Sequence, residues 1–271
     1  MFYRISRFIA LFIFAALIIV PSMVVVFGSF KTDLEIYDRP LFPPLDWTVA
    51  NYKRLFTDSA IEQNFLNSLI VTGFSVTITL LLASLAAFGI ARMINVTGKV
   101  LFLLFSIGLA IPAATNIIAI FQLFVQLKLN NSLTGLVLIN IAATLPIAIF
   151  ILTAFFRQIP AEMYEVASID GAGPVRLYRS IALPLSKPSM GAVAIFLFVI
   201  TWNDLLFPLL LITQQDKKTL PLAMLDFRGE YSISFSMIFT AVMVASIPMV
   251  IMYLLMQRTF VAGLTAGAVK G

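Results

Sequence analysis

The chain has 271 residues, of which 61% are hydrophobic and only 11% are charged, and its mean hydropathy is +1.01. Soluble domains usually carry about 25% charged residues, so this composition excludes an ordinary soluble protein. The sequence has no Cys and no His, which excludes disulfides, thiol nucleophiles, typical zinc sites and imidazole acid–base chemistry.

Long charge-free stretches recur along the chain. Five stretches carry no charge: 8–30, 63–91, 100–127, 129–156 and 231–257. A sixth stretch, 188–215, carries only Asp204. A helix that crosses a bilayer needs about 20 apolar residues, so each stretch is long enough. We predict an all-α, polytopic membrane protein with six transmembrane helices and a cytoplasmic helical docking loop. The predicted spans are 8–30, 65–91, 100–127, 133–156, 189–212 and 235–257.

The N-terminal segment resembles a secretory signal, because Arg4 and Arg7 precede an apolar run. The run covers 23 residues, which is longer than a signal core, and no A-x-A-like site precedes Lys31. We therefore predict an uncleaved first span.

The distribution of charge predicts the orientation. With the N-terminus inside, the inner segments hold ten basic and three acidic residues, and the outer segments have a net charge of −1. Basic residues are retained on the cytoplasmic side of membrane proteins, so both termini are predicted to be cytoplasmic. The same rule accounts for the pI of about 9.6, so the high pI does not indicate nucleic acid binding.

Proline occurs in five of the six predicted spans. It removes a backbone donor and kinks a helix. These prolines fit ordinary packing in a helix bundle and also a bundle that changes shape. They are Pro21, Pro112, Pro146, Pro208 and Pro248.

The outer segment 31–64 contains a proline cluster, which argues against regular structure, and charges of alternating sign. We predict a solvated loop, with Trp47 and Tyr52 able to anchor at the membrane interface. Contact with an external partner is an alternative.

The inner segment 157–187 predicts two short helices. Pro160 favours the start of a helix over 161–169, which Asp170-Gly171 ends. Pro174 starts a second helix, which Leu183-Pro184 is expected to stop. The pair would carry an apolar patch that packs either on its own spans or on another protein.

The spacing Glu165-x-Ala167-x3-Gly171-x9-Ile181-x-Leu183-Pro184 is similar to the loop signature E-A-A-x3-G-x9-I-x-L-P of permease subunits of bacterial ABC importers. Val166 replaces the second residue of that signature. Further segments resemble the carbohydrate permeases of the maltose-transporter type, in particular the six-span partner subunit: 47–56, 67–68, 86–92, 202–208, 219–221 and 257–271.

The resemblance implies that a separate subunit hydrolyses ATP and drives alternating access. In agreement, the sequence has no G-x-x-x-x-G-K-[ST] phosphate loop, so the chain is expected to be no enzyme and to hold no cofactor or metal. The implied partners are a homologous second permease, two copies of a cytoplasmic ATPase and an external solute-binding protein. The implied ATPase-docking residues are Glu162, Met163, Glu165, Val166, Ala167, Asp170, Gly171, Ala172, Ile181, Leu183 and Pro184.

Asp204 is the only charged residue inside a predicted span. A charge at that depth is expensive and usually faces a cavity or a partner. It either lines a substrate path or forms a hydrogen bond between helices. The predicted path residues are Trp202, Asn203, Asp204, Asn116 and Gln122.

The predicted organisation has three parts. Residues 1–64 form the first span and the outer loop, 65–257 form a core of five spans with the docking loop 157–188, and 258–271 form a cytoplasmic tail. The resemblance implies a permease subunit in the bacterial cytoplasmic membrane that imports a sugar or oligosaccharide. The alternatives are a phosphorylated polyol or another polyhydroxylated solute, and a self-contained secondary transporter or channel.

Overall fold

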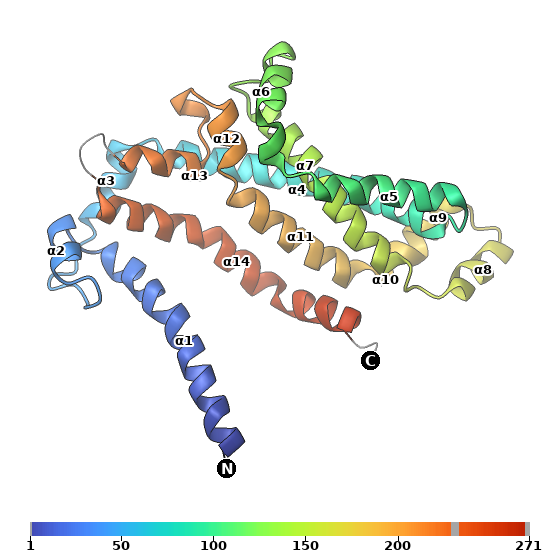
Figure 1. The fold of residues 1–271 in the computed structure, drawn as a ribbon, viewed down its shortest axis with the longest axis horizontal. Helices are drawn as coiled ribbons and strands as arrows, with labels where there is room; N and C mark the ends of the chain where they lie inside the picture. The colour runs from blue at the N-terminus through green and yellow to red at the C-terminus, as the bar shows by residue number, and fades with distance from the viewer. Residues whose placement is uncertain (1, 229–232, 269–271) are drawn as a thin grey trace. The chain divides into compact units, whose positions relative to one another are not determined.

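The computed structural model describes residues 2–228 and 233–268. Over these residues the chain is helical, with one isolated antiparallel bridge between Arg228 and Ile233 (Figure 1). It forms two compact units: unit 1 comprises residues 1–65 and 219–249, and unit 2 comprises residues 66–218 and 250–271.

Unit 1 contains the N-terminal helix and the outer segment. Its elements are α1 (Phe2–Gly28), α2 (Asp33–Asp38), α3 (Ala50–Asp58), the start of α4 (Ile61–Arg92), α13 (Leu220–Ala223), η4 (Met224–Phe227) and the first part of α14 (Phe235–Ala268). The outer segment is therefore more regular than predicted, since α2 and α3 lie within it. Thr32 starts α2 because its hydroxyl accepts the Glu35 N–H at 3.3 Å.

A buried lysine organises the outer segment of unit 1. Lys31 is 1% exposed, and its ammonium donates to the carbonyls of Arg39 and Phe42, each at 2.6 Å. The amide of Asn51 donates to the carbonyls of Ser29 and Lys31 at 3.0 and 2.8 Å. These bonds hold the non-helical stretch after α2 to the end of α1 and the start of α3.

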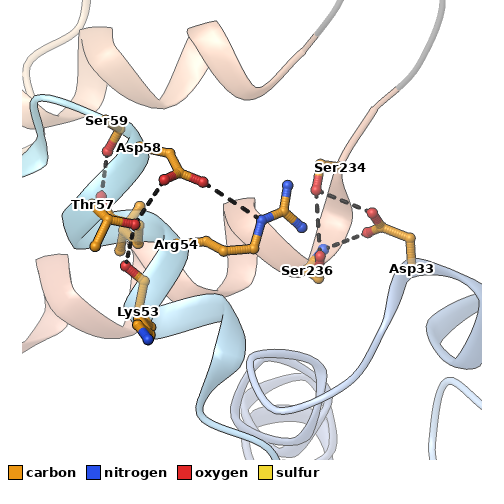
Figure 2. Close-up of polar contacts among 9 residues, drawn as sticks. Asp33, Lys53, Arg54, Thr57, Asp58, Ser59, Ser234 and Ser236 are labelled. Atoms are coloured by element: carbon orange, nitrogen blue, oxygen red, sulfur yellow. Dashed lines mark hydrogen bonds and ion pairs between the residues drawn. The ribbon is translucent and has the colours of Figure 1, made fainter.

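Figure 2 shows how the start of α14 joins the same segment. The Asp33 carboxylate accepts from the Ser234 hydroxyl at 3.1 Å and from the Ser236 N–H at 2.8 Å. Arg54 and Asp58 of α3 form an i,i+4 ion pair at 3.9 Å. That pair is solvent-exposed and so contributes little to stability.

Unit 2 contains most of α4 and the helices from α5 to η3. These are α5 (Val96–Ala110), η1 (Ala113–Asn116), α6 (Ile117–Gln126), α7 (Leu133–Phe156), α8 (Ala161–Ile169), α9 (Pro174–Leu177), η2 (Tyr178–Ala182), α10 (Leu183–Leu185), α11 (Lys187–Trp202), α12 (Leu206–Leu211) and η3 (Gln215–Lys217). Helix α7 is central, since it packs against α5, α11 and α12. Figure 1 shows α8 and α9 gathered at the end of unit 2 where α4 ends and α5 begins.

Four predicted spans are single helices that are long and apolar enough to cross a membrane: Tyr3–Gly28, Ile61–Arg92, Leu133–Phe156 and Phe235–Gln257. The third predicted span is instead bent by 77° between Val96–Ala110 and Ala114–Gln126. Pro112 lies at this break, where it precedes η1. Pro21, Pro146 and Pro248 stay inside continuous helices.

The fifth predicted span, 189–212, also differs from expectation. Helix α11 ends at Trp202, and the short α12 begins only at Leu206. At its other end, α11 meets the helical stretch Pro174–Leu185 at an angle of 76°. Counting each bent pair as one span gives up to six candidate spans among the described residues.

The core of unit 2 lies between α4 and α7 and extends to α8 and α11. Small residues such as Ala83 and Ala148 are fully buried in it, which lets the helices approach closely. The hydroxyls of Thr79 and Thr144 are 3.2 Å apart across α4 and α7. This contact gives two buried polar groups a partner within the apolar core.

Candidate functional site

The loop 157–187 is built around α8, whose predicted bounds 161–169 the structure reproduces. The helix ends in a Schellman motif. Gly171 N–H donates to the Ser168 carbonyl at 3.0 Å, and Ala172 N–H donates to the Ala167 carbonyl at 2.9 Å. Gly171 has a φ of +80°, which favours glycine. The Ala-x3-Gly spacing of the loop signature is therefore the spacing of a helix cap.

The outer face of α8 is apolar. Met163, Val166 and Ile169 recur every three residues and are 43%, 61% and 85% exposed. Glu162, Glu165 and Asp170 are also exposed, so acidic groups surround the apolar residues. Met163, Val166 and Ile169, defined here as the α8 face, have no cover within the described part of the chain.

The opposite side of α8 is fixed to the core of unit 2 by aromatic rings. Tyr164 is 5% exposed. Its ring centroid lies 6.2 Å from that of Phe88 on α4, and Phe88 lies 6.1 Å from Phe156 at the end of α7. The guanidinium of Arg92 lies 4.4 Å from the Tyr164 ring centroid. Burial raises the pKa of the Tyr164 phenol, and the Arg92 charge opposes that rise.

The second helical stretch of the loop adds another attachment. Its Tyr178 ring lies 5.3 Å from Phe88, and its hydroxyl is 2.7 Å from the Ser84 hydroxyl on α4. Phe88 therefore contacts Tyr164, Tyr178 and Phe156, and we call these four residues the aromatic cluster. Through this cluster the loop is packed directly on α4 and α7.

The expected stop at Leu183-Pro184 is wrong by a short distance. The helical stretch passes through the π-helical turn η2 and ends at Leu185. Pro184 comes directly after the π-helical turn, whose last bond runs from the Leu183 N–H to the Tyr178 carbonyl. Ile181 and Leu183 are half-buried, whereas Pro184 is exposed.

Asp204 occupies the break between α11 and α12. Its Oδ1 accepts the N–H groups of Leu206 and Phe207 at 3.0 and 3.4 Å, which caps α12. Asn140 on α7 is a polar neighbour of the carboxylate. Oδ2 of Asp204 is buried and has no hydrogen bond of ordinary geometry in the described part of the chain. One oxygen of this carboxylate, Oδ1, thus has a structural role as the acceptor for the first N–H groups of α12.

The other predicted path residues have different surroundings. Trp202 is 2% exposed, and its ring stacks on that of Phe198 at 5.7 Å. The exposed Asn203 amide donates to the Val199 carbonyl at 2.8 Å. Asn116 in η1 and Gln122 in α6 are exposed. A substrate role for these four residues stays a prediction, and stacking of a sugar on Trp202 would require its ring to become exposed.

Residues 79–265 match the family described as "binding-protein-dependent transport system inner membrane component". The chain belongs to this family. The matched region includes the aromatic cluster, α8 and Asp204, so the features described above lie within the family's common part.

Relatives within the family match the chain over nearly its full length. The diacetylchitobiose uptake system permease protein NgcG of Streptomyces coelicolor is 34% identical, covering 96% of this chain and 87% of that protein. The melibiose/raffinose/stachyose import permease protein MelC of Bacillus subtilis is 32% identical over 93% of this chain and 91% of that protein. The trehalose/maltose transport system permease protein MalG of Thermococcus litoralis is 32% identical over 99% and 97%.

Two solved structures share the fold. A chain of a bacterial ABC transporter that imports the acidic polysaccharide alginate has a TM-score of 0.83 and 20% identity, covering 96% of both chains. A chain of a bacterial alginate transporter in complex with a periplasmic protein bound to an alginate pentasaccharide has a TM-score of 0.71 and 14% identity, covering 94% and 92%. The membership and the apolar helices agree with a multi-pass inner membrane protein.

The aromatic cluster was not predicted from the sequence. The eleven predicted docking residues include neither Tyr164 nor Tyr178, whose rings make the contacts to Phe88 on α4. A signal was present in the sequence, because Tyr164 is the one aromatic residue in the predicted helix 161–169. Its ring offers the largest apolar surface in that short helix and so favours burial.

Proposed function

We propose that this chain is one permease subunit of an ATP-driven importer for a sugar or oligosaccharide. It would pair with a homologous second permease, two copies of a cytoplasmic ATPase and an external solute-binding protein. The full-length similarity to NgcG, MelC and MalG supports this assignment, since their names describe import of sugars. ATP would be hydrolysed outside this chain, and α8 would receive the resulting movement.

The observation that carries the proposal is the two-sided construction of α8. The uncovered α8 face is apolar and surrounded by Glu162, Glu165 and Asp170, as suits a surface buried by a protein partner. On its other side, Tyr164 packs on Phe88 between α4 and α7. A partner that moves α8 as a rigid body would therefore tilt α4 and α7 with it.

In the proposed topology the chain crosses the membrane six times, with both termini and the loop 157–188 in the cytoplasm. Each bent helix pair counts as one crossing. The excess of basic residues on the segments assigned to the inside supports this orientation. The helical residues after 257 would then form a cytoplasmic extension of α14.

The break around Asp204 would face the path of the solute. Non-helical backbone at membrane depth is tolerated where protein or a water-filled cavity surrounds it. The buried Oδ2 of Asp204 offers an acceptor for a sugar hydroxyl, and Asn140 offers a neighbouring amide. Asn203 beside them, and Asn116 and Gln122 elsewhere in unit 2, would add polar groups to the same path.

ATPase measurements on the assembled complex test the proposed function. The complex is reconstituted with its binding protein and a panel of neutral oligosaccharides, monosaccharides and phosphorylated polyols. We expect one sugar, loaded on the binding protein, to stimulate ATP hydrolysis severalfold over the unloaded binding protein. Stimulation by a phosphorylated polyol alone would refute the sugar assignment, and hydrolysis that no loaded binding protein alters would refute the importer assignment.

A further inference from the structure

A pocket lies beside α8, and Ile169 at the end of the α8 face is one of its lining residues. Its volume is about 520 Å³, and its walls come from the ends of α4 and α7 and from α8 itself. The residues that matter for its chemistry are Arg92, Arg157, Tyr164, Glu165 and Ser168. All of them belong to unit 2.

The pocket has an excess of positive charge. Arg92 and Arg157 contact aromatic rings, with Arg157 lying 4.7 Å from the centroid of Phe102. Neither guanidinium forms an ion pair with a carboxylate in the described part of the chain. Glu165 supplies the single negative charge of the lining. Two arginines therefore remain available to an anion, and their planar forks suit phosphate.

The remaining walls are mostly apolar and include Ala91, Ile94, Phe156 and Ile159. A free phosphate or a nucleotide phosphate gains nothing from such walls, whereas the first carbons of an acyl chain do. Arg92 is in the last turn of α4, and Arg157 follows the last residue of α7. Both helices are candidate spans, so in the proposed topology these ends would lie at the cytoplasmic boundary of the membrane.

We propose that this pocket binds the headgroup phosphate of an anionic phospholipid from the cytoplasmic leaflet. Basic pockets between helices on the cytoplasmic side are suited to such lipids. A lipid bound there would touch α4, α7 and α8 together, and so would stiffen the connection through which the ATPase is proposed to act. The inference rests on the proposed membrane orientation but not on the identity of the solute.

Native mass spectrometry of the full-length chain in non-ionic detergent tests the site. The chain is titrated with phosphatidylglycerol or with phosphatidylcholine, and the double variant R92Q/R157Q is compared with the wild type. We expect phosphatidylglycerol binding to fall about fivefold for each arginine removed. Phosphatidylcholine binding should not change.

A matched control removes two other inner charges, in K99Q/K187Q, which do not line the pocket. Retention of tight phosphatidylglycerol binding by R92Q/R157Q, or an equal loss in K99Q/K187Q, would overturn the proposal. Displacement of the lipid by millimolar inorganic phosphate would also overturn it, because the site would then be a general anion site.

Two further measurements keep the result interpretable. The variant R92K/R157K retains the charge and should bind more lipid than R92Q/R157Q, which a folding defect would not produce. If R92Q/R157Q does not fold, R157Q alone carries the test, with K99Q as its control. Lipid binding is measured without transport, so the failure of this proposal is distinguishable from failure of the proposed importer function.

Discussion

At the scale of single residues, Gly171 and Asp204 each end or begin a helix by backbone chemistry. Gly171 takes a positive φ to close the cap of α8, and Asp204 accepts the first N–H groups of α12. Both residues were singled out in the sequence for function, as part of a docking signature and as a buried charge. The structure gives each residue a structural role at a helix end. Substitutions can therefore be chosen that change this structural role and a functional role separately.

Replacing Gly171 with Ala should weaken the α8 cap. No atom lies within 4 Å of the position that a Cβ would occupy, so the effect would come from backbone strain of about 1–2 kcal/mol. Hydrogen exchange of the amides at the end of α8 should become about tenfold faster. Gly173→Ala is the matched control, because Gly173 has a negative φ of −74° and equally open surroundings. Equal exchange in the two variants would contradict the assigned cap.

Substitutions of Asp204 should separate capping from transport. Asp204→Ala removes the cap of α12 and should lower stability by about 1 kcal/mol, seen as a lower Tm of the purified chain. Asp204→Asn keeps an oxygen acceptor and should retain most of the Tm. If Asp204 lies on the solute path, Asp204→Asn should still slow uptake. Unchanged uptake in Asp204→Asn would leave Asp204 with a structural role alone.

At the scale of elements, helix α8 is the part that the sequence predicted best. Its bounds follow from Pro160 and Asp170-Gly171, because the start and stop signals act locally. Breaks within apolar stretches were harder to predict. The stretch 189–212 is apolar on both sides of residues 203–205, and hydropathy does not reveal that a carboxylate caps a new helix there. The aromatic cluster was missed because it joins residues far apart in the sequence.

A charge on the α8 face should weaken ATPase binding. Val166→Asp places a carboxylate in the centre of the proposed interface, where it would be buried without a partner. We expect the affinity of the permease pair for the ATPase to fall about tenfold or more, measured by sedimentation or surface-based binding. Val49→Asp is the control, since Val49 is 68% exposed in the outer segment, which the proposed topology assigns to the opposite side of the membrane. Equal losses in both variants would argue against α8 as the docking element.

At the scale of the whole molecule, composition and charge distribution predicted an all-helical membrane protein, and the family and the fold comparisons confirm it. Four of the predicted spans are continuous helices, and the remaining two are broken. The orientation stays a prediction. It follows from where basic residues lie relative to the membrane, and contacts within the chain carry no information on that. The outer segment was predicted to be irregular, but it contains the short helices α2 and α3. These helices were not predicted because local signals such as the Thr32 cap stand within a polar, proline-containing segment.

The orientation is testable because the chain contains no Cys. Single cysteines are introduced at Leu45, 67% exposed in the outer segment, and at Ile169, 85% exposed on α8. A membrane-impermeant maleimide should label Leu45→Cys in intact cells and label Ile169→Cys only after permeabilisation. The reverse pattern would invert the topology and remove α8 from reach of a cytoplasmic ATPase.

Uptake in proteoliposomes tests the central claim most directly. Vesicles contain either this chain alone or the complete complex, and accumulation of a radiolabelled oligosaccharide is followed with ATP supplied on the cytoplasmic side. The account predicts accumulation against a gradient with the complete complex, its loaded binding protein and ATP together. It also predicts no movement through vesicles that contain this chain alone. Sugar-specific uptake by this chain alone, without ATP, would contradict it and identify a self-contained transporter or channel.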